Sequence, residues 1–495
     1  MSPDPAPDPW ADPARFGQAF QAFLEAFVYT AERPSSDLSG LVEGHLGVDP
    51  LAAPVISRVY PAYQLASLHL GVGSYIDGQD LSRVLGISGP GREYRSLTEL
   101  LTEGGVSGFR SAAVEYRAVT VGVEEEMTCV SCALWLVKHR SAAGGPVEQC
   151  GDADGARENG RQVPVAVLLR ADDPNDPDGG IKLDVMAADA VVAAEVIAAI
   201  EAATVQHDVL RGKVMSIQPH GLGEGLGPMR FHRRPHVTID DLVLPDGLLD
   251  LVERQVVGIA KHRDLLRSRG QHLRRGVLLH GPPGTGKTLT IRYLLGHAED
   301  FTILLITGPA IRHLAAACDL ARRLQPAMVV IEDVDLVAED RMMVEGPQPL
   351  LFQMLDELDG LEDDADVAFV LTTNRVGVLE RALVERPGRI DVVVEVPLPD
   401  AAGRRRLFRL YGAALEVSEA DLDDAADACP GVTASFVKEC VRRAVLISAE
   451  RGSSHTERQD LQQGMDELLA SREEVSGRLL GAQSQHSSAD LGGYC

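Results

Sequence analysis

The feature that most constrains this chain is an eight-residue segment, Gly281–Thr288, with the sequence GPPGTGKT. It follows the apolar run 277–280 and leads into a segment with helical spacing. A GxxxxGK[ST] pattern between a strand and a helix is typical of a loop that holds phosphates. Glycine lets backbone amides approach the anion closely, and the helix N-terminus adds the positive end of its dipole. A chance glycine-rich turn is the alternative, but it does not explain eight matching positions in this context.

The residue types of this loop suit a nucleotide bound with Mg²⁺. Lys287 is expected to neutralise the β- and γ-phosphates, and the Thr288 hydroxyl to give the metal a hard oxygen ligand. The full set expected around the phosphates is Gly281, Pro282, Pro283, Gly284, Thr285, Gly286, Lys287, Thr288 and Leu289.

Two carboxylates, Glu332 and Asp333, directly follow the apolar run 327–331. A strand that ends in two carboxylates suits a Mg²⁺-nucleotide site, where one holds the metal through water and the next polarises the attacking water. Glu332 falls at the metal position and Asp333 at the base position, so the usual Asp-Glu order is inverted. Asp335, two residues on, also fits an acidic N-cap.

Three further polar residues follow the next apolar run, 367–373. Asn374 is predicted to hold the lytic water between the γ-phosphate and Asp333, although asparagine also ends strands in ordinary surface turns. Arg386 and Arg389 flank a Pro-Gly turn, and a permanently charged, planar guanidinium suits a developing phosphoryl charge. The predicted catalytic residues are therefore Glu332, Asp333, Asn374, Arg386 and Arg389, and the predicted metal ligands are Thr288 and Glu332.

The arrangement of apolar runs predicts how the chain divides. Five short runs between residues 277 and 396 alternate with amphipathic segments, which predicts a parallel sheet covered by helices on both faces. Only helical patterns follow, and the region before the glycine-rich segment 219–230 mixes strand and helix patterns. The predicted parts are a disordered tip (1–13), an N-terminal α+β domain (14–218), a linker (219–236), a nucleotide-binding domain (237–399), a helical domain (400–470) and a disordered tail (471–495).

Composition and charge narrow the class of protein. The chain has 47 Lys and Arg against 73 Asp and Glu, a formal net charge of −26, and its aromatic content is 4%. Such a surface repels nucleic acid, and few aromatics are present to stack on bases. Seven scattered cysteines fit a reducing cytosol, and the N-terminus has no signal-peptide pattern. We therefore expect a cytoplasmic protein with neither a nucleic-acid nor a membrane partner.

One Cys-x-x-Cys pair, Cys129 and Cys132, raises a metal or redox alternative, with His139 and Cys150 nearby. Its surroundings, MTCVSCALWLV, predict a strand, in which residues three apart point to opposite faces. A redox pair of this kind normally begins a helix. We therefore favour a structural role for these cysteines over a metal site.

Two other segments have a structural and a functional interpretation. His232, Arg233, Arg234 and His236 form a basic cluster, which is expected to pack on the protein's own acidic surface and less readily to bind an anionic ligand. The Ala-rich helix predicted over 187–206 is expected to belong to the core and less readily to form a partner groove.

From Thr238 to about Arg451 the sequence resembles the AAA family of ATPases. The resemblance implies an αβα P-loop NTPase domain with a five-stranded parallel sheet and a helical lid. It also implies ATP bound between the subunits of a homo-oligomeric ring, usually a hexamer, with Arg386 and Arg389 acting on the γ-phosphate of the next subunit. The shared landmarks are DDLVLPDG (240–247), RRGVLLHGPPGTGKT (274–288), VVIEDVD (329–335), LLFQMLDELDGL (350–361) and VAFVLTTNRVGVLERALVERPGRID (367–391).

Three departures from the family pattern bear on function. The inverted Glu332-Asp333 pair is similar to that of the mitochondrial AAA assembly ATPases of respiratory complexes. The interval 307–326 has no aromatic residue where family unfoldases carry a pore loop. In the lid, Phe436 stands where the family usually has Asp.

These observations predict a Mg²⁺-dependent ATPase that hydrolyses ATP to ADP and phosphate in a ring and remodels a protein partner recruited by the N-terminal domain. The partner is not identified by the sequence. The alternative is a nucleotide-gated scaffold that binds ATP with little hydrolysis, which Asp333 at the base position and the missing pore aromatic favour.

Overall fold

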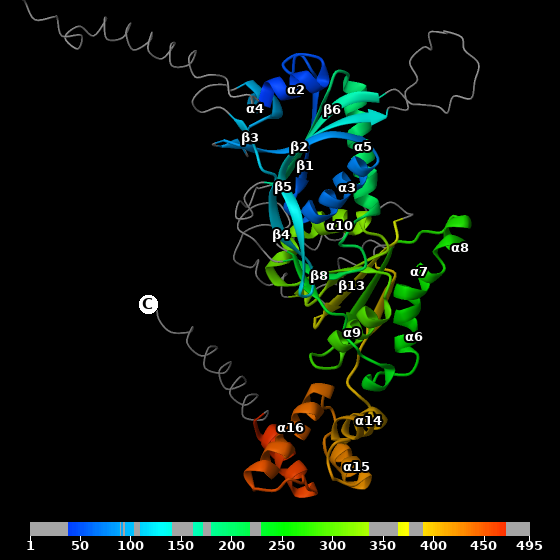
Figure 1. Cartoon of the computed structure of the whole chain (residues 1–495). Helices are drawn as coiled ribbons and strands as arrows, with labels where there is room; N and C mark the ends of the chain where they lie inside the picture. The colour runs from blue at the N-terminus through cyan, green and yellow to red at the C-terminus, as the bar shows by residue number, and fades with distance from the viewer. Residues whose placement is uncertain are drawn as a thin grey trace, which may run out of the picture. The chain divides into compact units, whose positions relative to one another are not determined.

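The computed structural model describes residues 38–89, 91–92, 95–102, 109–140, 162–171, 180–217, 229–335, 365–375 and 390–471. The chain forms two compact units that meet in sequence at Leu210 and Arg211, and we call them the N-terminal unit and the C-terminal unit (Figure 1). The predicted tip (1–13) lies outside the described residues, as does the predicted tail (471–495) after its first residue.

The N-terminal unit is built on a seven-stranded antiparallel sheet in the order β1-β7-β6-β5-β2-β3, with β4 paired to β5. Its strands are β1 (Val55–Pro61), β2 (Asp80–Ser88), β3 (Arg110–Ala112), β4 (Glu115–Gly122), β5 (Glu125–Arg140), β6 (Gln162–Ala171) and β7 (Gly180–Ala187).

Helices pack on this sheet in two separate apolar cores. One core joins α3 (Leu65–Asp77) and α5 (Ala190–Gln206) to the sheet, and the other joins α2 (Leu38–Leu46) and α4 (Leu97–Thr102). The long strand β5 contributes to both cores and is therefore buried on both faces, which explains its nearly continuous apolar sequence. Helix α5 is the predicted Ala-rich helix, and its apolar side chains lie in the first core, as expected.

The C-terminal unit contains a second seven-stranded sheet in the order β14-β10-β13-β12-β11-β8-β9. Five of these strands are parallel and coincide with the five predicted apolar runs, so the predicted parallel αβα fold is confirmed. They are β10 (Arg275–His280), β11 (Thr302–Ile306), β12 (Ala327–Ile331), β13 (Val367–Thr373) and β14 (Val392–Glu395).

Two further strands extend the sheet beyond the predicted five. β8 (Val214–Ile217) pairs in parallel with β11, and β9 (Met229–His232) pairs antiparallel with β8. The sequence analysis assigned these residues to the N-terminal domain and the linker, but they belong to the C-terminal unit. A sheet edge offers unpaired backbone groups to any nearby strand. The periodicity of a four-residue strand does not tell which of two sheets it joins.

Helices flank the parallel strands. α6 (Leu248–Glu253) and α9 (Lys287–His297) share an apolar core with the sheet, while α10 (Leu314–Arg323) packs against β11 and β12 outside that core. The interval 307–326, which lacks a pore aromatic, forms a 3₁₀ turn, η5 (Gly308–His313), and α10. The remaining elements before β10 are η3 (Ile239–Asp241), a π-helical turn η4 (Arg254–Gly258), α7 (Ile259–Lys261) and α8 (Arg263–Ser268).

A helical subdomain, which we call the lid, follows residue 400. It consists of α14 (Ala401–Gly412), α15 (Glu419–Ala428), α16 (Ala434–Glu450) and helical residues 458–471, which surround one apolar core. The N-cap side chains of its three labelled helices, Asp400, Ser418 and Thr433, each accept a hydrogen bond from the backbone N–H three residues on.

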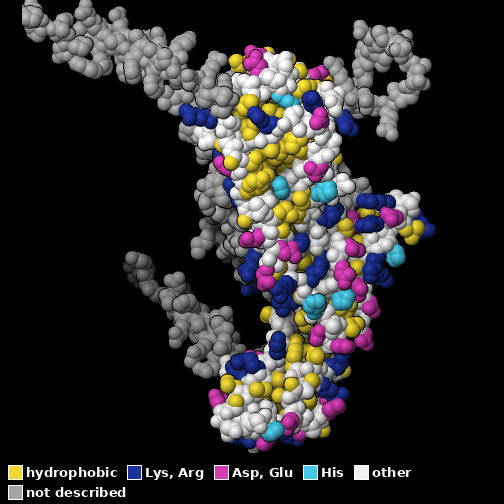
Figure 2. Space-filling view, viewed as in Figure 1, with side chains coloured by type: hydrophobic (Ala, Val, Ile, Leu, Met, Phe, Trp, Pro, Cys, Tyr) yellow, Lys and Arg dark blue, Asp and Glu magenta, His cyan; other side chains and the backbone are white. Residues whose placement is uncertain are grey.

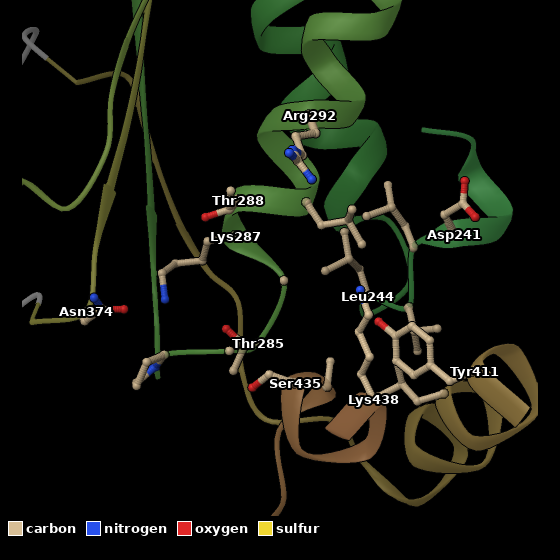
Figure 3. Close-up of a pocket in the computed structure, with 18 of the residues that line it drawn as sticks. Asp241, Leu244, Thr285, Lys287, Thr288, Arg292, Asn374, Tyr411, Ser435 and Lys438 are labelled. Atoms are coloured by element: carbon tan, nitrogen blue, oxygen red, sulfur yellow. The ribbon is translucent and has the colours of Figure 1, made fainter. Parts of the chain in front are cut away.

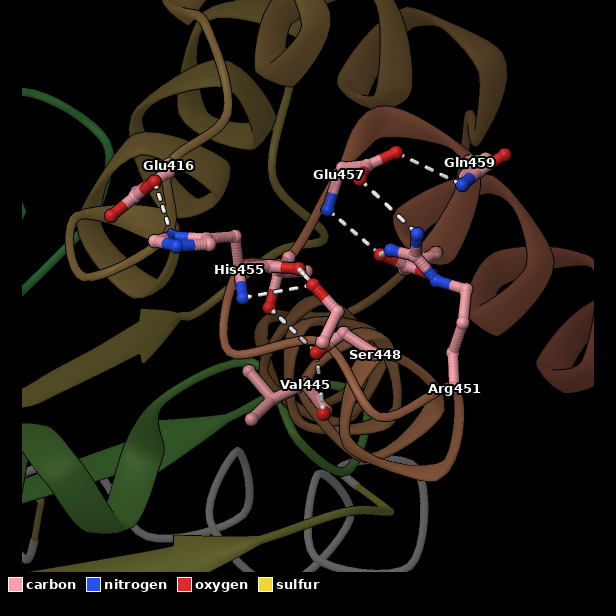
Figure 4. A network of polar contacts seen from close by, with 10 residues as sticks. Glu416, Val445, Ser448, Arg451, His455, Glu457 and Gln459 are labelled. Atoms are coloured by element: carbon pink, nitrogen blue, oxygen red, sulfur yellow. Dashed lines mark hydrogen bonds and ion pairs between the residues drawn. The ribbon is translucent and has the colours of Figure 1, made fainter.

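A polar network surrounds the segment that follows α16 in the lid (Figure 4). Arg451 donates to Glu457 at 3.1 Å and to the buried Asp460 at 2.7 Å. His455 lies 2.5 Å from Glu416 and links the segment after α16 to the loop before α15. These contacts fix where the helical residues 458–471 begin.

The surface of the molecule carries charges of both signs. On the face shown in Figure 2, described basic side chains are interspersed with acidic ones, so the negative charge of the sequence is not gathered in one block there. Among the described residues, no helix combines the length and apolar character that a membrane span requires.

Candidate nucleotide-binding site

The segment Gly281–Gly286 connects β10 to α9 and depends on glycine at two positions. Gly281 has a φ of 142°, and a Cβ there would lie 2.2 Å from the Val396 carbonyl oxygen. Gly284 has a φ of 79°, and a Cβ there would lie 2.0 Å from Ser435 Oγ. Both the backbone conformation and the available space therefore exclude a side chain at these two positions.

Lys287 is held inside this loop as a buried cation. Its Nζ donates to the carbonyl oxygens of Gly281 at 2.7 Å and Pro282 at 2.9 Å. Burial lowers the pKa of Lys287, and the carboxylates of Asp333 and Asp335 oppose that shift. A desolvated ammonium beside backbone N–H groups at a helix start is stabilised by an anion, so the loop fits a bound phosphate.

Thr288 and Glu332, the two predicted metal ligands, lie next to each other. The Thr288 hydroxyl donates to Glu332 Oε2 at 3.2 Å. Burial raises the pKa of Glu332 and the Asp333 charge adds to the shift, while the Thr288 hydrogen bond opposes it. Hydroxyl and carboxylate oxygens are the hard ligands that Mg²⁺ requires, so this donor set fits the metal.

Asp333 and Asn374 meet at the ends of the neighbouring strands β12 and β13. The Asn374 amide Nδ2 donates to Asp333 Oδ1 at 3.1 Å, and the Thr372 hydroxyl accepts from the Asp333 backbone N–H at 3.0 Å. Asp333 has a φ of 50°, a left-handed conformation that costs energy in a residue with a side chain. The carboxylate at the base position is thus fixed in direction by its own backbone and by Asn374.

Asp335 stabilises the Asp333–Asn374 pair by accepting hydrogen bonds at the end of β13. Its Oδ1 accepts from the Thr373 hydroxyl at 3.0 Å and from the Asn374 backbone N–H at 3.2 Å, and the residue is buried. The sequence analysis considered it an acidic N-cap. Its contacts instead hold the C-terminal end of β13, from which the Asn374 side chain projects.

The loop and the lid enclose a cavity of about 410 Å³ (Figure 3). Predicted site residues line one end of it, including Lys287, Thr288, Asp333 and Asn374. The cavity is also lined by residues that sequence reasoning did not assign to the site: Asp241, Leu242, Val243, Leu244, Arg292, Leu407, Tyr411, Ala434, Ser435 and Lys438.

Two of those residues, Tyr411 of α14 and Lys438 of α16, lie side by side in the lid. The Lys438 ammonium is 5.9 Å from the centre of the Tyr411 ring, and burial raises the pKa of Tyr411. The signals available in the sequence were the DDLVLPDG segment, which resembles the family, and the lid segment 431–436, which follows the family pattern only loosely. Neither assigned a role to these side chains. The predicted arginines, Arg386 and Arg389, lie outside the described residues.

The structure bears on two segments that the sequence analysis considered structural: the cysteine pair and the basic cluster. Cys129 and Cys132 both lie in strand β5, one in each of the two apolar cores, so they face opposite sides of the sheet, as predicted. Within the described ranges, no cluster of three or more His, Cys, Asp or Glu side chains could hold a metal ion. Arg234 packs on the C-terminal unit, as expected of the basic cluster. Its guanidinium donates to the backbone carbonyls of Gly212, Leu295, Ala298 and Phe301.

Comparison with known proteins places this unit in a family. Residues 277–398 match the ATPase family associated with various cellular activities (AAA). The chain is 33% identical over 276 residues to ATP-dependent zinc metalloprotease FtsH 1 of Sphaerobacter thermophilus, covering 52% of this chain and 42% of that protein. It is 28% identical over 279 residues to the proteasome-activating nucleotidase of Methanopyrus kandleri, covering 53% of this chain and 64% of that protein.

The chain thus spans between two fifths and two thirds of the length of these two relatives. The family match agrees with the predicted P-loop α/β fold, with ATP and Mg²⁺ as the ligands of this domain and with the ATPase class. The chain therefore carries the ATPase domain of the AAA family.

Proposed function

We propose that this chain hydrolyses ATP to ADP and phosphate with Mg²⁺ in a homo-oligomeric ring, and that the ring remodels a protein partner recruited by the N-terminal unit. The observation that supports the chemistry is that Lys287, Thr288 and the Asp333–Asn374 pair line one cavity, with Glu332 in contact with Thr288. Each supplies a different requirement of phosphoryl transfer.

The proposed roles follow from the contacts. Lys287 exchanges its loop carbonyls for phosphate oxygens, and Thr288 with Glu332 holds the metal. Mg²⁺ at this place neutralises charge on the phosphates. Asp333 accepts a proton from the attacking water, and the Asn374 amide keeps one carboxylate oxygen occupied so that the other faces the cavity.

Replacing the proposed base tests the reaction directly. Asp333→Asn should leave ATP binding near the wild-type level and lower steady-state phosphate release by about 10²–10⁴-fold, the usual contribution of general base catalysis. Asp319→Asn makes the same chemical change at an exposed position of α10 and should release phosphate like the wild type. Equal phosphate release by Asp333→Asn and Asp319→Asn would exclude Asp333 as the base.

The ring and the two arginines form a separate part of the proposal. If Arg386 acts on the neighbouring subunit, Arg386→Ala should cut turnover by about 10³–10⁵-fold while ATP still binds. A mixture of Arg386→Ala and Lys287→Ala subunits should then hydrolyse ATP faster than either variant alone, because some interfaces combine an intact loop with an intact arginine. Subunit exchange without such rescue would contradict action between subunits.

A second candidate function is a nucleotide-gated scaffold that binds ATP with little turnover. The short Asp333 side chain at the base position, already bonded to Asn374 at 3.1 Å, favours it. ATP-dependent assembly together with phosphate release no faster in the wild type than in Asp333→Asn would support the scaffold over the ATPase.

A further inference from the structure

The lid contacts the phosphate-binding loop through the first turn of α16. The Ser435 backbone N–H donates to the Gly284 carbonyl oxygen at 3.1 Å. The Ser435 hydroxyl also lies beside Gly284, because a Cβ added to this glycine would be 2.0 Å from Ser435 Oγ and 3.2 Å from Thr433 Oγ1. Figure 3 shows Ser435 directly beside the loop that carries Thr285.

The position of Ser435 in the helix explains why its N–H is available. The first backbone N–H groups of an α-helix have no partner within the helix. In α16 the Thr433 side chain accepts from the Phe436 N–H at 3.3 Å, and the Gly284 carbonyl accepts from the Ser435 N–H. The loop therefore completes the cap of a helix of 17 residues.

This bond also fixes the direction of a loop amide. In a trans peptide the C=O of one residue and the N–H of the next point in opposite directions. When the lid holds the Gly284 C=O on its side, the Thr285 N–H must point away from Ser435. A peptide that follows a glycine reorients easily, because glycine tolerates both signs of φ. The contact from the lid removes that freedom.

We propose that the hydrogen bond from Ser435 to Gly284 is a latch, by which the lid holds the Gly284–Thr285 peptide in its phosphate-binding orientation. Ser435 is then a positioning residue for the phosphates, and displacement of the lid lowers affinity for nucleotides that carry them. The latch rests on the nucleotide site proposed above and adds a means of regulating it from the lid.

Proline at position 435 tests the latch, because it removes the N–H without cutting a hydrogen bond inside the helix. Ala420→Pro is the matched control. Ala420 is also the second residue of a capped lid helix, α15, whose N-cap Ser418 accepts from the third residue in the same way, and α15 contributes no residue that lines the cavity. Ser435→Ala is the conservative variant, since it loses the hydroxyl and keeps the N–H.

Calorimetry with ADP, ATP and adenosine gives the readout. Ser435→Pro should bind ADP and ATP about three- to tenfold more weakly than the wild type, the usual effect of losing one hydrogen bond. Its affinity for adenosine should be unchanged, because the latch acts on the phosphates alone. Ser435→Ala and Ala420→Pro should bind all three ligands within about twofold of the wild type, which is below the effect of one such bond.

Several results would overturn the latch. One is a folded Ser435→Pro chain that binds ADP as tightly as the wild type. The others are a Ser435→Ala chain that loses as much ADP affinity as Ser435→Pro, and a Ser435→Pro chain that loses as much affinity for adenosine as for ADP. If circular dichroism shows that Ser435→Pro does not fold, Ser435→Val decides instead, since its two γ-methyl groups replace an Oγ that already lies close to Gly284 and therefore crowd this contact. ADP affinity equal to the wild type in Ser435→Val would then overturn the proposal. Failure of the wild type to bind ADP would overturn the site and the latch together, whereas ADP binding without phosphate release would reject only the ATPase.

Discussion

The two ends of the cavity differ in how they are built. The phosphate end comes from a loop, two strand ends and the start of α9, and its side chains are bonded to one another, as in the Thr288–Glu332 and Asp333–Asn374 pairs. The lid end comes from residues 241–244, α14 and α16, and its cation, Lys438, is exposed whereas Lys287 is buried. The first end suits charge chemistry that needs fixed geometry, and the second suits a contact that changes when the lid moves.

The largest effect should come from the phosphate end. Lys287→Ala removes a buried cation that can make charge-assisted bonds to two phosphates, so ATP affinity should fall by about 10²–10⁴-fold. The fold should survive, because among the described residues the Lys287 ammonium donates only to carbonyls of its own loop. Calorimetry measures the affinity, and circular dichroism checks the fold. Unchanged ATP affinity would remove the phosphate-end assignment.

A matched change at the lid end should have a much smaller effect. Lys438→Met removes a cation that is exposed to solvent, and such charges contribute about 1 kcal/mol or less. We expect ATP affinity to fall about two- to fivefold. Lys438→Arg keeps the charge and should retain wild-type affinity. A loss in Lys438→Met as large as that in Lys287→Ala would show that the two ends do not differ in the way we describe.

The smallest effect should be a change in the melting temperature of the C-terminal unit when Glu332 is replaced. Burial raises the pKa of Glu332 above its ordinary value of 4.5, so the folded state disfavours its charged form. Above the folded pKa the carboxylate of the wild type stays charged and bears the full cost of burial, so Glu332→Gln should then raise the melting temperature of the C-terminal unit. As pH falls toward 4.5 the wild type takes up the proton and the advantage disappears. Scanning calorimetry of both chains at pH 7.5 and pH 4.5 measures this difference, and an advantage for Gln that grew on acidification would contradict it.

The sequence predicted the phosphate end because its chemistry is local. The loop residues are contiguous, and Glu332, Asp333 and Asn374 each end an apolar run, so parallel strands bring them to one edge. The lid end could not be predicted in this way, because Leu244, Tyr411 and Lys438 meet only through packing between distant segments. The strands β8 and β9 were assigned to the wrong side of the boundary for the same reason, since a short strand is defined by the partner it pairs with.

The contacts of Arg234 have a mechanical consequence. Helix α9 begins at Lys287, and with 11 residues it is about 16 Å long. At its far end, Arg234 joins the carbonyls of Leu295 and Ala298 to that of Gly212, two residues after the chain leaves the N-terminal unit. Helix α9 therefore connects the phosphate loop to the segment around Gly212, where the C-terminal unit begins. We expect an axial displacement of α9 at its N-terminus to reach, through Arg234, the segment that follows the N-terminal unit.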